Sequence, residues 1–227
     1  SNAKSCMIID GSLTATSLSV EDCLIGIEID GTAQINGLTA AHVDNDGLRI
    51  TGTATLSDLD LTDMSAGISS VGDITVSGAE FTDIGTGISL SGGHSDVDTL
   101  NFNSGIGNAV SISSNASGDI DGMTGDSNNA IVAMDSTGFT ISNVDMTGER
   151  LVNSWSAGDL TVSNAVFESD SGETPIDIRT SGTVSLSDIT LTGQFSSMQG
   201  SFNAPWIGVA LAGSGDFIIS NSDIEST

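Results

Sequence analysis

Apolar and polar residues alternate along almost the whole chain, in short runs separated by glycine or by Asn and Asp. In residues 72–90, for example, the apolar positions include Ile74, Val76, Phe81 and Ile88. A period of two residues predicts β-strands with one buried face, and a helical period is found nowhere at useful length. The pattern therefore predicts an all-β protein.

The same frame of short strands recurs about every 20 residues. A glycine opens each repeat. The first spacings between these glycines are 20, 21, 20 and 20 residues, and later spacings reach 26 or more. The glycines are Gly11, Gly31, Gly52, Gly72, Gly92, Gly118, Gly138, Gly158, Gly182 and Gly213 or Gly215. Constant short spacing with occasional insertions is typical of stacked turns with variable loops. We expect a right-handed parallel β-helix, a solenoid of about ten rungs with three short strands in each.

The alternation also predicts which side chains fill the solenoid. We expect the following residues to point inward: Ile27, Ile35, Leu56, Leu61, Val76, Phe81, Ile88, Ile141, Val162, Phe167, Ile178, Leu186 and Leu191. Ile, Leu, Val and Ala suit the narrow interior of a solenoid. The scarcity of aromatic residues, with seven Phe, two Trp and no Tyr, agrees with such a core.

One position between two strands of each rung has a distinctive composition. The ten residues at this position are Ser17, Gly37, Asp58, Gly78, Thr99, Gly122, Asn143, Asn164, Asp188 and Asn221. Eight of them are Gly, Asn or Asp, which tolerate a left-handed backbone at a tight corner. A strand, an Asn/Gly corner and a second strand resemble the pectate-lyase-like right-handed parallel β-helix superfamily. The resemblance covers essentially the whole chain and implies an architecture, without specifying an activity.

Two other repeat architectures do not fit. Residues 56–61 match the first part of a leucine-rich repeat, but Met64 stands where that motif requires Asn, and no helical half-repeat follows. A left-handed hexapeptide helix requires a six-residue apolar period, which is absent.

The net charge of the chain limits the partners and the surroundings that suit the protein. The 227 residues carry 30 Asp and Glu against four Lys and Arg, a formal net charge of −26. This charge repels nucleic acid and acidic polysaccharides. Low Lys with Asp above Glu resembles proteins of halophilic or marine prokaryotes. No run of 18 apolar residues is present, so we expect no membrane span.

The ends of the chain suggest how the sequence was delimited. Ser1-Asn2-Ala3 resembles an expression-tag scar, and residues 4–227 form a single predicted domain. Both ends fall inside a rung, whereas solenoids normally cover their ends. We expect that the domain was excised from a longer surface protein.

The resemblance raises the question of polysaccharide cleavage. Lyases of this superfamily use a basic residue to abstract a proton, and its hydrolases place several Asp beside a His. The only Lys and Arg residues are Lys4, Arg49, Arg150 and Arg179, and the rungs of His42 and His94 carry no recognisable signature. We therefore predict no catalytic residue.

A column of acidic residues is the candidate cation site. Asp22, His42 and Asp63 align one rung apart, followed by Asp83, and Asp44 and Asp46 lie beside them. Rungs stack about 4.8 Å apart, so neighbouring carboxylates are close enough to share calcium. The competing interpretation is a hydrated turn ladder, because no complete calcium-loop motif is present. We expect no cofactor other than calcium at this column.

Aromatic and basic residues form a second candidate site. Trp155 follows a strand, Arg179 follows the equivalent strand of the next rung, and Arg150 lies nearby. An exposed Trp beside an Arg suits sugar binding, and the insertion from Gly193 to Trp206 extends this surface. The competing interpretation is a small satellite core of aromatic side chains.

The two cysteines are a candidate disulfide. Cys6 aligns with Gly26 of the next rung, and Cys23 lies three residues earlier in the loop, so the two sulfurs are placed to meet. A bridge there fits an oxidising exterior, while buried free thiols are the alternative.

Together these features favour a non-catalytic extracellular ectodomain, a stalk or adhesin of a prokaryotic surface protein. Its expected partners are glycans or other surface proteins. The alternative is a polysaccharide-active enzyme or a carbohydrate-binding module on the same scaffold.

Overall fold

The chain folds as an all-β solenoid of parallel strands, as predicted. The computed structural model describes residues 4–155, 158–170, 173–193 and 208–226. One sheet contains sixteen strands: β1 (Ser5–Ile9), β2 (Ser12–Glu21), β3 (Ile25–Ile29), β4 (Thr32–Ile50), β5 (Thr53–Ser70), β6 (Ile74–Leu90), β7 (His94–Ser104), β8 (Asn108–Ile112), β9 (Ser117–Met134), β10 (Gly138–Trp155), β11 (Asp159–Ser169), β12 (Ile176–Thr180), β13 (Val184–Gly193), β14 (Val209–Gly213), β15 (Phe217–Ser220) and β16 (Asp223–Ser226).

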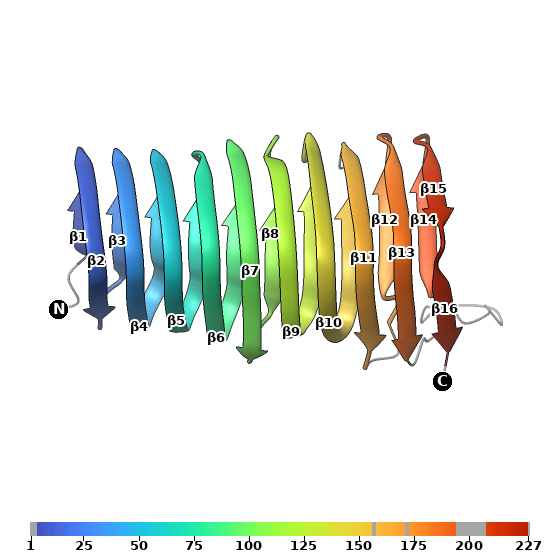
Figure 1. Cartoon of the computed structure of the whole chain (residues 1–227), viewed down its shortest axis with the longest axis horizontal. Helices are drawn as coiled ribbons and strands as arrows, with labels where there is room; N and C mark the ends of the chain where they lie inside the picture. Colours follow the sequence, from blue (N-terminus) through green and yellow to red (C-terminus); the bar gives the residue numbers. More distant parts are fainter. Residues whose placement is uncertain (1–3, 156–157, 171–172, 194–207, 227) are drawn as a thin grey trace.

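The turns stack along one axis, so the molecule is a rod with its two termini at opposite ends (Figure 1). The solenoid has about nine turns, not the expected ten. The expectation counted the ten glycines that open repeats, and ten such positions are separated by nine repeat lengths. The part of the chain that the structure describes contains no helix long and apolar enough to span a membrane.

The predicted corner is confirmed at all ten positions. Each of these residues has a left-handed backbone, with φ between +50° and +87°. The left-handed region is nearly free of strain for Gly and accessible to Asn and Asp, which explains the composition of the column. The chain turns there without losing its pairing, so β4 runs continuously from Thr32 to Ile50.

A second left-handed corner follows five residues after the first in the early turns. It is formed by Asp22, His42, Asp63 and Asp83, with φ between +51° and +56°. The column that the sequence suggested as a cation site is therefore also a structural corner. Its preference for Asp has a backbone cause that is independent of any ligand.

The core contains every residue that the alternation placed inward, each at most 2% exposed. At its centre Phe81 and Phe102 stack with their ring centroids 5.0 Å apart. Glycine is required opposite each ring, because a Cβ at Gly67 would lie 2.7 Å from Phe81 and one at Gly87 would lie 2.5 Å from Phe102. Large and small residues thus complement each other across a narrow interior.

Candidate functional site

An open groove follows the second corner and is lined by residues of several successive turns. It has a volume of about 740 Å³ and lies between residues of successive turns: Asp22, His42, Val43, Asp44, Asp63, Met64, Ser65 and Gly85. A smaller groove of about 400 Å³ adjoins it at Gly85 and is lined further along by Asp126 and Asp170.

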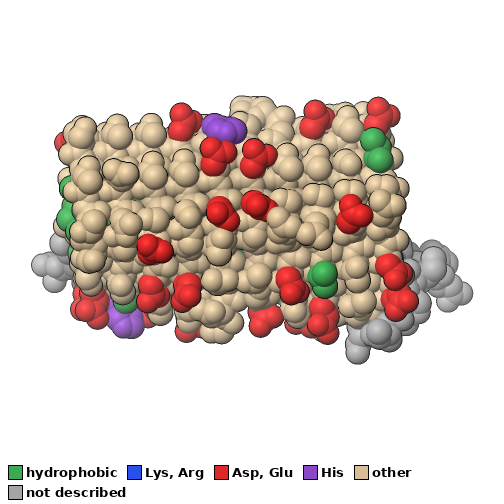
Figure 2. Space-filling view, in the orientation of Figure 1, with side chains coloured by type: hydrophobic (Ala, Val, Ile, Leu, Met, Phe, Trp, Pro, Cys, Tyr) green, Lys and Arg blue, Asp and Glu red, His purple; other side chains and the backbone are tan. Residues whose placement is uncertain are grey.

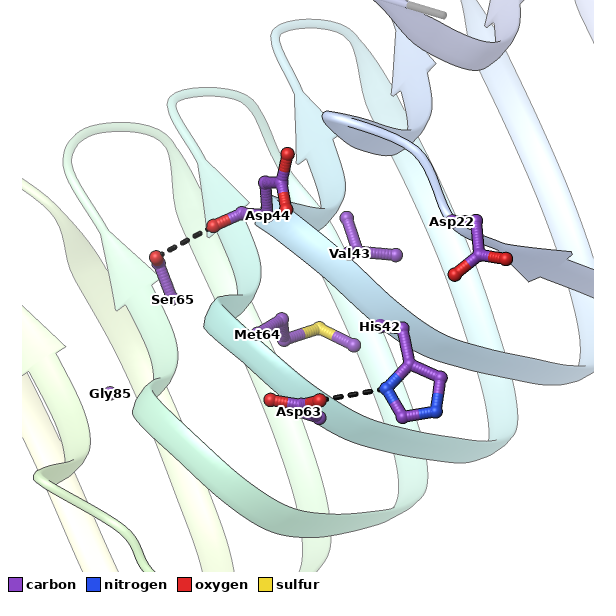
Figure 3. A pocket seen from close by; sticks show the side chains of 8 residues that line it. All are labelled: Asp22, His42, Val43, Asp44, Asp63, Met64, Ser65 and Gly85. Carbon is purple, nitrogen blue, oxygen red and sulfur yellow. Dashed lines mark hydrogen bonds and ion pairs between the residues drawn. The ribbon is translucent and has the colours of Figure 1, made fainter. Parts of the chain in front are cut away.

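Two of the residues that line this groove, His42 and Asp63, form an exposed pair (Figure 3). The imidazole Nδ1 lies 2.7 Å from Asp63 Oδ2 across two adjacent turns. This hydrogen bond raises the pKa of His42 above its ordinary value, and the charges of Asp63, Glu21 and Asp22 act in the same direction. The pair is thus a small pH-sensitive element on the surface.

Ser65 and Asp22 also line the groove. Ser65 Oγ donates a hydrogen bond of 2.8 Å to the backbone carbonyl of Asp44. Asp22 lies on the preceding turn, away from the His42–Asp63 contact (Figure 3). Among the described residues, no three His, Cys, Asp or Glu side chains converge closely enough to hold a metal ion. Calcium binding at this column stays a prediction.

Asp46, which the sequence placed beside the column, is not among the residues that line the groove. It is 9% exposed and accepts hydrogen bonds from Arg49 Nε at 2.8 Å, from Arg49 Nη2, and from Ser69 Oγ at 2.6 Å. A bulge precedes Asp46, because two residues of β4 lie between Val43 and Asp46 where β5 has one. The extra residue makes Asp46 the register partner of Ala66.

The second predicted cluster is brought together in part. Trp155 and Arg179 are register partners on β10 and β12, and the guanidinium carbon lies 5.3 Å from the indole centroid. Arg179 is held by Asp177, whose carboxylate oxygens lie 3.2 Å from Nε and 3.0 Å from Nη2. Trp155 is 50% exposed, so it is not part of a satellite core formed by the described residues.

Arg150 lies apart from this cluster. Its guanidinium pairs with Glu173 at 2.9 Å, and five residues of extended strand place it roughly 16 Å from Trp155. The residue beside Trp155 on the other side is Met134, which is 45% exposed and which the sequence reasoning missed. Trp206 and residues 194–207 lie outside the described residues.

A further group of carboxylates was not anticipated. Asp96 pairs in register with Asp119, and Asp98 with Asp121, so two neighbouring turns carry a two-by-two array of Asp on one face. Acidic side chains gather in the middle of the face drawn in Figure 2, over β7 and β9. His94 Nε2 lies 3.3 Å from Asp96 Oδ1. Aligning the two Asp-x-Asp sequences by repeat would have revealed this array.

The cysteines lie where the sequence placed them. The structure joins Cys6 of β1 to Cys23, which precedes β3, with their Cα atoms 5.8 Å apart. The bridge connects the first turn to the second.

Comparison with protein-family models, with curated proteins and with solved structures found no match to this chain. The geometry of the described residues is therefore the basis for assigning a function.

Proposed function

We propose that this chain is a non-catalytic, surface-exposed rod of a prokaryotic cell, a stalk or adhesin-like segment that projects or presents a recognition surface. One observation carries the proposal: an uninterrupted stack of parallel turns gives an elongated, laterally regular body with a formal charge of −26. Such a body suits spacing and presentation. High negative charge keeps it soluble and favours a salt-rich exterior.

The acidic surface also argues against cleavage of acidic polysaccharides. A substrate such as a uronic-acid polymer would approach a surface of like charge. The four Lys and Arg residues are a small supply of proton-abstracting or carboxylate-neutralising groups, and three of them are engaged by Asp46, Glu173 and Asp177. Membership of the pectate-lyase-like superfamily is proposed at the level of architecture only.

Two measurements test this proposal. Antibodies against the chain should label intact cells of the source organism, and added protease should remove the epitope without lysis. The purified chain should release no reducing ends or unsaturated products from neutral or acidic polysaccharides. Turnover that a single Asp or Arg substitution abolishes would refute the non-catalytic assignment, and labelling only after lysis would refute the surface location.

A second candidate function, recognition of a neutral glycan, is favoured by the cluster of Trp155, Arg179 and Asp177. A half-exposed indole offers an apolar surface for the C–H face of a sugar, and the Arg–Asp pair offers donors and acceptors for its hydroxyls. Trp155→Ala should abolish binding to the glycan that a panel of neutral oligosaccharides identifies. Val166→Ala is the matched control, because Val166 is 48% exposed and lies outside this cluster. Equal binding by both variants would contradict the assignment.

A further inference from the structure

Trp155 has neighbours of opposite polarity on the turns before and after it. Its register partners are Met134 on β9 and Arg179 on β12. Strands of consecutive turns are about 4.8 Å apart, so side chains that are register partners lie within reach of one another. The exposed fraction is 45% for Met134 and 50% for Trp155, so both present apolar surface to solvent. The indole thus lies between a thioether and a guanidinium group.

A second column of side chains, two residues earlier on the same strands, has the same gradient of polarity. Asn153 pairs in register with Val132 on β9 and with Asp177 on β12, and all three are partly buried. Residues two apart on a strand point to the same face, so the two columns share one surface. This surface is apolar on its β9 side and charged on its β12 side.

The charged side is held by a pair of hydrogen bonds. Arg179 donates from Nε and Nη2 to the carboxylate of Asp177, over 3.2 and 3.0 Å, and its guanidinium carbon lies 5.3 Å from the centroid of the Trp155 ring. A guanidinium has five N–H donors, so Asp177 orients the group and leaves further donors for a ligand. Donors and acceptors for hydroxyl groups are therefore concentrated on one side of the indole.

We propose that this surface recognises a neutral 6-deoxyhexose, a sugar in which a methyl group replaces the usual hydroxymethyl group at C6. We call the surface the Trp155 platform, formed by Val132, Met134, Asn153, Trp155, Asp177 and Arg179. The inference rests on the second candidate function, recognition of a neutral glycan, and specifies the class of sugar.

A 6-deoxyhexose has the same gradient of polarity as the platform. With its C–H face on the indole, hydroxyl groups on one side reach Arg179 and Asp177, and the C6 methyl group on the other side lies on Met134. The methyl group gains from leaving water, and a flexible thioether adapts its shape to it. A hydroxymethyl group placed there would lose hydration without gaining a strong hydrogen-bond partner from Met134 or Val132.

The charge of the chain disfavours the acidic sugars of similar shape. A uronic acid carries a carboxylate at C6, which would be desolvated on Met134 and repelled by a chain of net charge −26. Arg179, the cation of the platform, is already paired with Asp177. Uronic acids should therefore bind more weakly than the neutral sugars.

The test compares sugars that differ only at C6, by ligand-detected NMR titration of the whole chain. The pairs are L-fucose with L-galactose and L-rhamnose with L-mannose. Wild type should bind the deoxy member of at least one pair about three- to tenfold more tightly, because one methyl group is buried. Trp155→Ala should abolish binding of both members.

Met134 is the residue expected to make the distinction. Met134→Gln should abolish the preference for the deoxy sugar, whereas Met134→Leu should retain it. Arg179→Ala should weaken binding of both members equally, because it removes contacts to hydroxyl groups and none to the methyl group. Val166→Gln is the matched control: Val166 is 48% exposed and lies outside the platform, so this variant should bind as wild type does.

The outcomes separate this inference from the function on which it rests. If wild type binds neutral sugars but prefers the deoxy member of neither pair, or if Met134→Gln keeps the preference, glycan recognition stands and the 6-deoxyhexose assignment is overturned. A methyl preference limited to N-acetylglucosamine over glucose would place an acetamido group on Met134 and would also overturn this assignment. No binding of any neutral sugar would overturn both.

Discussion

At the scale of single residues, each side chain has a role set by the face on which it lies. Val76 points into the core and is 1% exposed, while its neighbour Thr75 points outward on the same strand. Val76→Ala should lower the free energy of unfolding by about 1–3 kcal/mol, because buried methyl groups are lost and a cavity remains. Thr75→Ala should change it by less than about 0.5 kcal/mol. Urea denaturation measures both, and equal effects would place the two residues on the wrong faces.

The His42–Asp63 pair is expected to make stability depend on pH. Because the pKa of His42 is raised in the folded chain by its hydrogen bond to Asp63, the pair stabilises the protein while His42 is protonated. This contribution is fully present below the ordinary value of 6.5 and disappears as pH rises through the raised pKa.

Asp63→Asn should therefore lower the melting temperature relative to wild type more at pH 5.5 than at pH 8.5. Asp83→Asn is the control, since Asp83 occupies the same corner one turn later and also has a left-handed backbone. A difference between wild type and Asp63→Asn that does not change with pH would contradict this role for His42.

At the scale of elements, the left-handed corners determine how each turn closes. Thr99 occupies such a corner with φ of +57°, which is unfavourable for a β-branched residue. Thr99→Asn should stabilise the chain by about 1 kcal/mol, even though the hydrogen bond from Thr99 Oγ1 to Asp98 is lost.

The reverse substitution at the next equivalent Asn provides the comparison. Asn143 has φ of +57°, donates to Asp121 and accepts from Asn164, so Asn143→Thr should destabilise the chain by at least the amount that Thr99→Asn gains. Chemical denaturation of both variants measures these changes. A destabilised Thr99→Asn would show that the strain at this corner is unimportant.

The bridge between Cys6 and Cys23 stabilises the first turn. It closes a loop with a sequence separation of 17, and a loop of this length is worth about 3 kcal/mol in the entropic account. Replacing both cysteines with Ser should lower stability by roughly that amount. Intact-mass analysis after denaturing alkylation should find no alkylated thiol, and two alkylated thiols would exclude the bridge.

At the scale of the whole molecule, charge density opposes folding. Stacking holds strands of adjacent turns about 4.8 Å apart, so Asp residues that are register partners, as in the pairs Asp96–Asp119 and Asp98–Asp121, stay close together. An unfolded chain separates these charges. The screening length falls from about 10 Å at 0.1 M salt to about 3 Å at 1 M, so the melting temperature should rise over this range.

One comparison isolates the stacked array from the net charge. Asp119→Asn should raise the melting temperature at 0.1 M salt, because Asp119 is paired in register with Asp96. Asp145→Asn removes the same charge from a position whose register partners are Thr124 and Val166, and should have a smaller effect. A melting temperature that is flat between 0.1 and 2 M salt would refute this electrostatic account.

The solenoid itself could be predicted from the residues, because its determinants are local. All thirteen side chains that the alternation placed inward are buried, and composition identified all ten positions of the first corner. Both depend on the conformation of a few consecutive residues. The two cysteines were paired correctly in space for the same reason, since a repeat of about 20 residues places Cys6 near the loop of Cys23.

The lateral surface was decided by tertiary structure. A one-residue bulge made Asp46 the register partner of Ala66, where its carboxylate pairs with Arg49. The register of β9, β10 and β12 placed Met134 and Arg179, not Arg150, beside Trp155. The array of four Asp arose in the same way from the pairing of β7 with β9. Which side chains meet across turns depends on how each insertion is absorbed, and this is set by hydrogen-bond register between distant residues. Local alternation specifies the face of a side chain but not its neighbour on the next turn.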